Sequence, residues 1–96
     1  MPAYLIVLQQ SATEDAESLA EYQQLTREMN NPTPVDPKVV YGAIEGLEGV
    51  APEAVVVLEF ASKDEARAWY NNEDYQRALP MRLKAAKYQA FIVEGL

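Results

Sequence analysis

Short apolar runs alternate with amphipathic segments along the chain, and their order predicts an α+β fold. Strands are predicted at 4–10, 39–47, 54–60 and 88–96, where β-branched and aromatic residues cluster between turn residues. Helical periodicity fills 16–29 and a second region that begins at Lys63. The order β-α-β-β-α-β is that of the ferredoxin-like fold. We therefore expect residues 1–96 to form one domain, with a four-stranded antiparallel sheet and both helices on one of its faces.

Capping residues mark the helix ends. Asp15 can cap the first helix, and Ser62 with Glu65 fits a capping box for the second. The apolar stripe of the first helix consists of Leu19, Tyr22, Leu25 and Met29. The second region changes stripe at "NNED", so we expect two helical pieces, the second capped by Asn72 and kinked or broken near Pro80. The stripe of that second piece consists of Tyr75, Leu79, Leu83 and Ala86.

The middle of the chain is rich in proline and glycine. Residues 30–37, "NNPTPVDP", contain three prolines and are expected to form a loop, because proline does not fit a helix interior or a central strand. Gly42 and Gly46 interrupt the predicted strand 39–47, which indicates a bulge or a close approach by another backbone or a ligand. The stretch "AVVVLEF" at 54–60 has the strongest strand signal and is expected to lie inside the sheet.

Both faces of the predicted sheet are apolar. In the strand 54–60, one face carries Val56, Leu58 and Phe60, and the other carries Val55, Val57 and Glu59. In the last strand, one face carries Phe91 and Val93 and the other carries Ala90 and Ile92. The two helices cover only one face of the sheet. On the other face, about five or six apolar side chains left in water would lose ~10 kcal/mol of burial free energy, which is as large as the whole stability of a small domain. We therefore expect a two-fold homodimer that packs sheet on sheet.

Composition and charge exclude several classes of function. The formal net charge of the 96 residues is −7, which disfavours a nucleic-acid partner. Histidine and cysteine are absent, so we expect no metal site, no haem or other cofactor, and no Ser-His or Cys-His catalytic pair. The apolar run 4–8 has no basic flank typical of a signal peptide, and no run approaches the ~20 residues of a membrane span. We expect a cytoplasmic protein with no membrane partner.

Aromatic and basic side chains gather in the second helical region. Trp69 and Tyr70 follow its apolar stripe, where a core role is commoner than a binding role, whereas the hydroxyls of Tyr70 and Tyr75 could line a pocket as donors. A basic stretch without acids contains Arg77, Arg82, Lys84 and Lys87. These cations either complement the helix macrodipole or form an anion site.

Glu59 and Arg82 allow two interpretations. Glu59 interrupts an apolar strand, and half-buried acids usually have a partner. Arg82 precedes Leu83, a position predicted to be buried, and could reach inward. The two side chains are either a structural ion pair, which we place first, or parts of a ligand site.

Several stretches resemble a known family. They are "AYLIV" at 3–7, "VVVLEFASKDEARAWYNNEDYQ" at 55–76, the arginine of "MRLKAA", which is Arg82, and the closing "FIVEGL". Together they resemble the domain-of-unknown-function family 1330 (DUF1330) of dimeric α/β-barrel proteins, most specifically from Glu59 to Gln76. The resemblance implies a ferredoxin-like homodimer with no established reaction. Many members carry a His-Gly-Gly-like stretch where this chain has "PVDPKVVYG", so no role of that histidine can be transferred.

Two classes of function remain open. The first is a small-molecule binder or enzyme with a pocket between the sheet and the second helix. Its candidate ligand-binding residues are Tyr41, Glu59, Trp69, Tyr70, Tyr75 and Arg82. Proteins that share the dimeric barrel fold include cofactor-independent mono-oxygenases and lactone isomerases, whose Trp, Tyr, Asn and Arg side chains hold an aromatic or enol substrate. The second class is a non-catalytic dimeric sensor or assembly module, in which the aromatic helix only completes the core.

Overall fold

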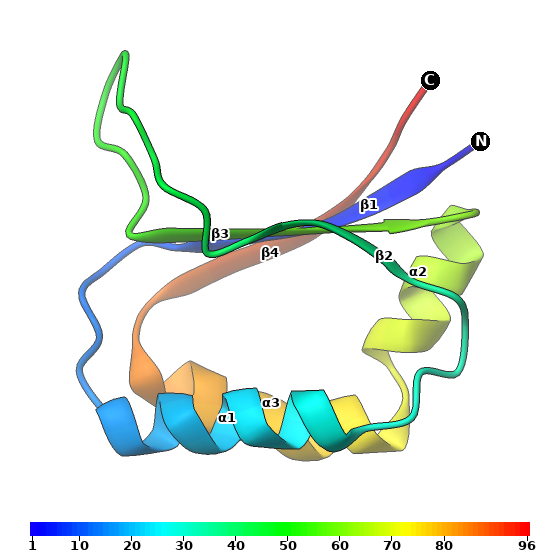
Figure 1. Ribbon diagram of the computed structural model, residues 1–96, viewed down its shortest axis with the longest axis horizontal. Coiled ribbons are helices and arrows are strands. Elements are labelled where there is room, and N and C mark those ends of the chain that lie inside the picture. The colour runs from blue at the N-terminus through cyan, green and yellow to red at the C-terminus, as the bar shows by residue number, and fades with distance from the viewer.

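Four strands form one antiparallel sheet in the order β2-β3-β1-β4 in the computed structural model, which describes residues 1–96 (Figure 1). The strands are β1 (Ala3–Gln9), β2 (Asp36–Val40), β3 (Ala54–Phe60) and β4 (Tyr88–Glu94). The helices are α1 (Ala16–Glu28), α2 (Lys63–Tyr70) and α3 (Glu73–Ala85). The predicted ferredoxin-like α+β fold and the inner position of β3 are confirmed. No helix combines the length and apolar character needed to cross a bilayer.

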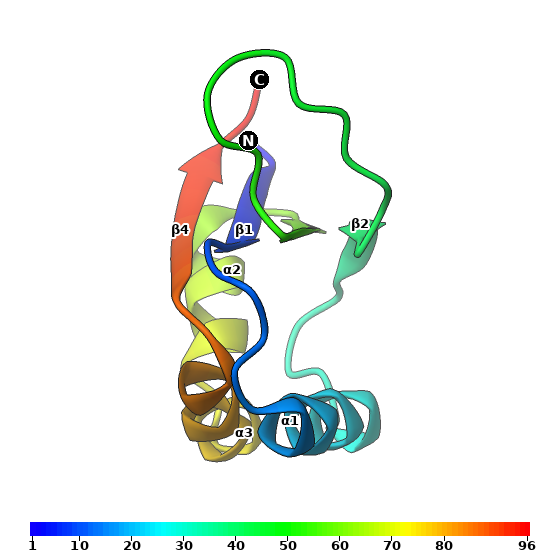
Figure 2. The same cartoon turned by 90° about the vertical axis from the view of Figure 1, so that its left-hand side faces the viewer.

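Side chains of β1 alternate between the two faces of the sheet. Along β1, Leu5 and Val7 are buried toward the helices, whereas Tyr4, Ile6 and Leu8 point to the opposite face and are half-buried. The pairing register extends this alternation across the sheet, because directly paired residues share a face. All three helices lie on one face of the sheet (Figures 1 and 2), and this is the face of Leu5, which shares the core with Trp69 of α2. The other face is open.

The second strand differs from its prediction at 39–47. It covers Asp36–Val40 instead and contains Pro37, with a register irregularity between Pro37 and Val39. Proline is tolerated because β2 is an edge strand, so one side of its backbone has no neighbouring strand to bond. Gly42 and Gly46 therefore lie beyond the strand, in the segment 41–53 that connects β2 to β3.

The second helical region is divided where it was predicted to be. The side chain of Asn72 accepts a hydrogen bond from the Tyr75 amide (3.0 Å) and caps α3, as expected. Of the expected kink or break near Pro80, the break is wrong, because α3 runs through this residue without interruption. Pro80 and Gln76 both lie on the exposed side of α3, so the Gln76 carbonyl that loses its helical bond faces water.

The buried face of α3 also differs from its prediction. Leu83, expected in the apolar stripe, is 59% exposed. The fully or nearly fully buried positions of the helix are Tyr75, Ala78, Arg82 and Ala85. Alanine at two of these positions lets α3 pack closely against α1, and this rotation of the helix turns Arg82 inward.

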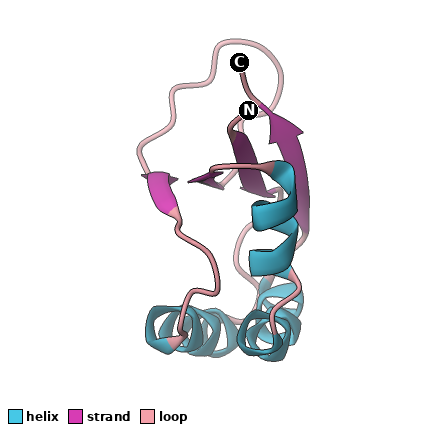
Figure 3. Cartoon of the chain, turned by 90° about the vertical axis from the view of Figure 1, so that its right-hand side faces the viewer, coloured by secondary structure: helices cyan, strands magenta, loops and turns pink.

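The division between α2 and α3 creates a space between the layers. α2 packs against the strands, whereas α3 turns away and packs along α1 (Figure 3). Seen along the layers, α3 lies on the β4 side and α1 on the β2 side (Figure 2). Aromatic side chains fill part of this space and form the core with Leu5, Val7 and Phe60.

Candidate functional site

A cleft of about 540 Å³ opens between α1 and the strands β2 and β3. Its walls include Gln23 and Arg27 of α1, Val40 of β2 and Val56 of β3. Deeper in, the cleft meets a more enclosed hollow of about 40 Å³. The residues that line both spaces are Tyr22, Tyr41, Val56, Leu58 and Trp69. The two spaces are therefore the mouth and the closed end of one site.

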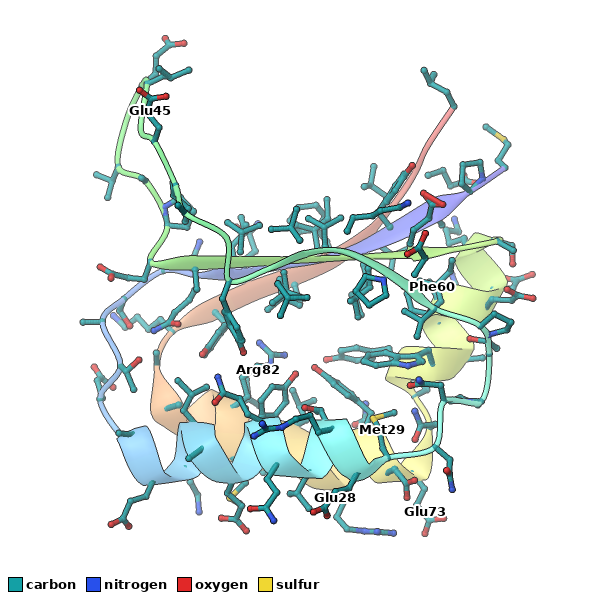
Figure 4. All side chains as sticks on the ribbon, viewed as in Figure 1. Glu28, Met29, Glu45, Phe60, Glu73 and Arg82 are labelled. Carbon is teal, nitrogen blue, oxygen red and sulfur yellow. The ribbon has the colours of Figure 1, made fainter.

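Arg82 lies at the closed end and is 3% exposed. It reaches up from α3 into the space below the sheet (Figure 4). Its Nε and Nη1 atoms are buried and have no hydrogen-bond partner, and no acid forms an ion pair with it. The guanidinium carbon lies 4.7 Å from the centre of the Tyr88 ring and 5.9 Å from that of Tyr22. Two aromatic faces thus offset part of the cost of burying the charge, but no anion neutralises it.

Two tyrosine hydroxyls meet beside this arginine. The Tyr22 and Tyr75 oxygens are 2.8 Å apart, and their rings pack edge to face at 6.0 Å. Burial raises the pKa of the Tyr22 phenol far above its usual value, an effect larger than the opposing influence of Arg82. Burial also raises the pKa of Tyr88. Both phenols are therefore neutral at physiological pH, and neither supplies a phenolate to Arg82.

The lining of the site is depleted of acids. The chain has 15 Asp and Glu residues and a formal charge of −7, yet no acid lines the cleft or the hollow. Two cations do, Arg82 at the closed end and Arg27 at the mouth. The site is thus a positive region in an acidic protein, which favours an anionic occupant.

Trp69 forms a fixed wall of the cleft. Its indole N–H donates to the Asn31 side-chain oxygen at 2.8 Å. Its ring is 4.7 Å from that of Tyr75 and 5.9 Å from that of Phe60, measured between ring centres. These contacts hold a flat apolar surface at the boundary of mouth and closed end, a surface suited to a planar ligand.

The hydroxyl pair gives a first stability prediction. Tyr75→Phe is expected to lower the free energy of unfolding by about 1 to 3 kcal/mol, because it leaves the buried Tyr22 hydroxyl without its partner. Thermal unfolding followed by circular dichroism should show a loss of several degrees. Tyr22→Phe combined with Tyr75→Phe removes both hydroxyls and should recover most of the loss. If the double variant loses as much free energy of unfolding as the two single variants lose together, the two residues are not coupled through this bond.

Four of the six candidate residues come together at this site, namely Tyr41, Trp69, Tyr75 and Arg82. Tyr70 lines neither space, although its ring centre is 5.3 Å from that of Tyr75; it faces Phe91 and Ile92 at the β4 edge. Glu59 lies on the opposite face of the sheet, because it alternates with the inward Leu58 and Phe60.

The expected Glu59–Arg82 ion pair is therefore wrong. A side-chain hydrogen bond with Glu59 instead raises the pKa of Tyr4, its directly paired neighbour on β1. The sheet itself separates Glu59 from Arg82. This leaves Arg82 without the carboxylate that the first of the two interpretations gave it.

Sequence reasoning missed three polar residues of the closed end. Tyr22 was placed only in the apolar stripe of the first helix, although a buried hydroxyl needs a partner. Tyr88, at the start of β4, and Gln9, at the end of β1, lie side by side in the register and both line the closed end. A polar residue at an inward position at a strand end was the signal that could have identified both.

No three acidic side chains come together at a position that could hold a metal ion. The arrangement can bind, orient and partly enclose a small organic molecule. The polar side chains at its closed end are the unpaired guanidinium of Arg82, four phenols, of which those of Tyr22 and Tyr75 are paired, and the Gln9 amide.

One family model and several solved structures match the chain along most of its length. The sequence model of a family described as a domain of unknown function (DUF1330) matches residues 2–96. No curated protein matches the chain. A solved structure from Bacillus halodurans, described as an ethyl tert-butyl ether d (EthD) family protein, has a TM-score of 0.65 at 16% identity and covers 100% of both chains.

Two other solved structures are described as dimeric ferredoxin-like proteins of unknown function. The one from Thermobifida fusca has a TM-score of 0.60 at 19% identity and covers 97% of this chain and 90% of its own. The one from Jannaschia has a TM-score of 0.65 at 16% identity and covers 99% of this chain and 100% of its own. At these identities the similarity concerns the fold.

Proposed function

The chain belongs to the DUF1330 family, and from that premise we propose that it is a homodimeric binding protein for a small, planar organic anion with an aromatic or conjugated body. The observation that carries this proposal is the buried guanidinium of Arg82 at the closed end of an aromatic cleft that contains no acid. A buried charge without a partner is costly, and an anionic ligand would offset that cost.

The size of the closed end fits the charged group of such a ligand. A volume of about 40 Å³ is slightly more than the ~30 Å³ that one water takes up in the liquid, so the closed end has room for a small charged group such as a carboxylate and for little else. The ligand body would then lie in the wider cleft, against Trp69 and Leu58. A single buried cation favours a monoanion over a dianion.

Binding is favoured over acid-base catalysis as the role of this site. The cleft holds no histidine, acid or lysine that could act as a general base near neutral pH. Burial raises the pKa of the Tyr22 and Tyr88 phenols, so they keep their protons near neutral pH and can only donate hydrogen bonds. The proposal therefore suits a ligand sensor or carrier, and an enzyme only where the substrate supplies its own reactivity.

The open sheet face supports the dimer. Its half-buried or exposed apolar residues include Ile6, Leu8, Val55, Val57, Phe91 and Val93. They form a continuous surface across β3, β1 and β4, because Ile6 pairs directly with Val57 on one side and Phe91 on the other. A second copy is the simplest cover, since the same surface can bury itself across a two-fold axis. Solved structures of the same fold are described as dimeric.

A titration with matched probes tests the ligand class. Calorimetry should detect binding of 2-naphthoate with a dissociation constant on the order of 100 μM. The neutral isostere 2-naphthamide should bind at least about tenfold more weakly, because it lacks the charge that meets Arg82. Equal affinities for the two probes would contradict an anion site and would leave only an apolar cleft.

A further inference from the structure

Tyr41 occupies an unusual backbone position at the edge of the cleft. It follows β2 directly, and its φ of 57° is in the left-handed region, which non-glycine residues rarely adopt. Its amide donates to the Val55 carbonyl at 3.0 Å, so the sheet holds its backbone on one side. A bulky residue persists in this conformation only when its surroundings hold it there, and such positions cluster at ligand clamps and switches.

The Tyr41 ring lies at the boundary between the two parts of the cleft. Five residues line both the mouth and the closed end, and four of them are on regular elements, α1, β3 and α2. Tyr41 is the one on a loop. It can therefore change position without breaking a helix or the sheet, and its movement would open or close the path to Arg82.

The segment that follows Tyr41 has little contact with its own chain. Residues 41–53, which we name the arm, connect β2 to β3 and rise beyond the open face of the sheet (Figures 1 and 2). The backbone bonds that tie the arm to the sheet are at its two ends, from the Tyr41 amide to Val55 and from the Glu53 amide to Gln9. Leu47 and Val50 are 88% and 99% exposed. Long loops without secondary structure are commonly functional.

We propose that Tyr41 gates the cleft and that a second copy of the chain sets the gate by holding the arm. This inference rests on the homodimer of the proposed function, because the arm extends toward the volume that the second copy would occupy. In the dimer, Leu47 and Val50 pack against the partner and fix the arm, which keeps Tyr41 in its left-handed conformation with the ring over the closed end. When the arm is free, the bond to Val55 is all that holds the Tyr41 backbone, so an extended conformation with the ring outside the cleft is populated beside the left-handed one. The dimer thus keeps the site enclosed.

Ligand binding and dimerisation are coupled in this arrangement. A ligand enclosed beneath Tyr41 raises the affinity of the two copies for each other, and dimerisation raises the affinity for the ligand. The two affinities change by the same factor. If the closed gate is populated about one tenth of the time without the partner, the apparent affinity of the ligand falls about tenfold.

The test uses Trp69, the only tryptophan in the chain, as a reporter. Trp69 lines both parts of the cleft and packs in the core on the helix side of the sheet, so its access to acrylamide reports on the gate and not on the dimer surface. Val50→Asp prevents apolar docking of the arm, Val50→Leu is its matched apolar control, and Tyr41→Gly removes the ring while suiting the left-handed backbone. The acrylamide quenching constant should rise about twofold or more in Val50→Asp and in Tyr41→Gly, but not in Val50→Leu.

The double variant Tyr41→Gly with Val50→Asp should be quenched no more than Tyr41→Gly alone, because both changes open one gate. Unchanged quenching in Val50→Asp, beside a rise in Tyr41→Gly, would overturn the role of the arm. Unchanged quenching in folded Tyr41→Gly, checked with Tyr41→Asn, would overturn the gate itself. The readout needs no ligand, so the predicted quenching pattern without any binding of 2-naphthoate would refute the anion site and leave the gate supported.

Discussion

Arg82→Met should lower the affinity for 2-naphthoate by about 100-fold and leave the fold intact. Methionine keeps the apolar stem of the side chain but removes the one charge at the closed end of the cleft. Because Arg82 has no acidic partner, the substitution strands no buried carboxylate. The melting temperature should therefore stay the same or rise, since replacing an unpaired buried charge by an apolar group is often stabilising.

A matched control separates this effect from a change in net charge. Arg77 is on the same helix and is exposed, where it lies 3.8 Å from Glu73 and 3.6 Å from Asp74. Arg77→Met removes one positive charge and should leave 2-naphthoate binding within about twofold. A melting temperature that falls by more than about ten degrees in Arg82→Met alone would contradict the account, since it would mean that the guanidinium stabilises the folded chain.

Val57→Asp should convert the dimer to a monomer at micromolar concentrations. Val57 lies on the open face, directly between Ile6 of β1 and Val39 of β2 in the pairing register. A carboxylate there would be buried without a partner, and two-fold symmetry places the change twice in the interface. The dimer dissociation constant should rise by at least about 1,000-fold, which analytical ultracentrifugation can measure.

Leu83→Asp supplies the control for this second prediction. Leu83 is also an exposed apolar residue, but it lies on the outer side of α3, away from the open face. This variant should remain dimeric, whereas Val57→Asp should not, and both should keep a native far-ultraviolet spectrum. A folded parent chain that sediments as a monomer at micromolar concentration would refute the assembly.

Local signals determined most of the fold. The two faces assigned to β3 and β4, the caps at Asp15 and Asn72, and the order of elements are all properties of short stretches, and the structure confirms them. The apolar character of both faces of β3 also follows from its alternation alone. These features depend on the fixed periods of helix and strand, which a sequence shows directly.

The errors arose where neighbouring elements decide the outcome. Pro37 fits in β2 only because that strand is at the edge of the sheet. Leu83 is exposed and Arg82 buried because α3 presents small residues to α1, and the direction in which a helix faces depends on its partner.

The sequence by itself determined the ferredoxin-like architecture, the apolar open face and the set of aromatic and basic residues from which the site is made. The tertiary structure alone decided which of them meet. It separated Glu59 from Arg82 by the thickness of the sheet, brought the hydroxyls of Tyr22 and Tyr75 to 2.8 Å, and left a buried guanidinium without a counterion. The physical reason is that burial and pairing of a charge depend on contacts between residues far apart in the chain. The spacing of apolar residues within one helix or strand contains no information on those contacts.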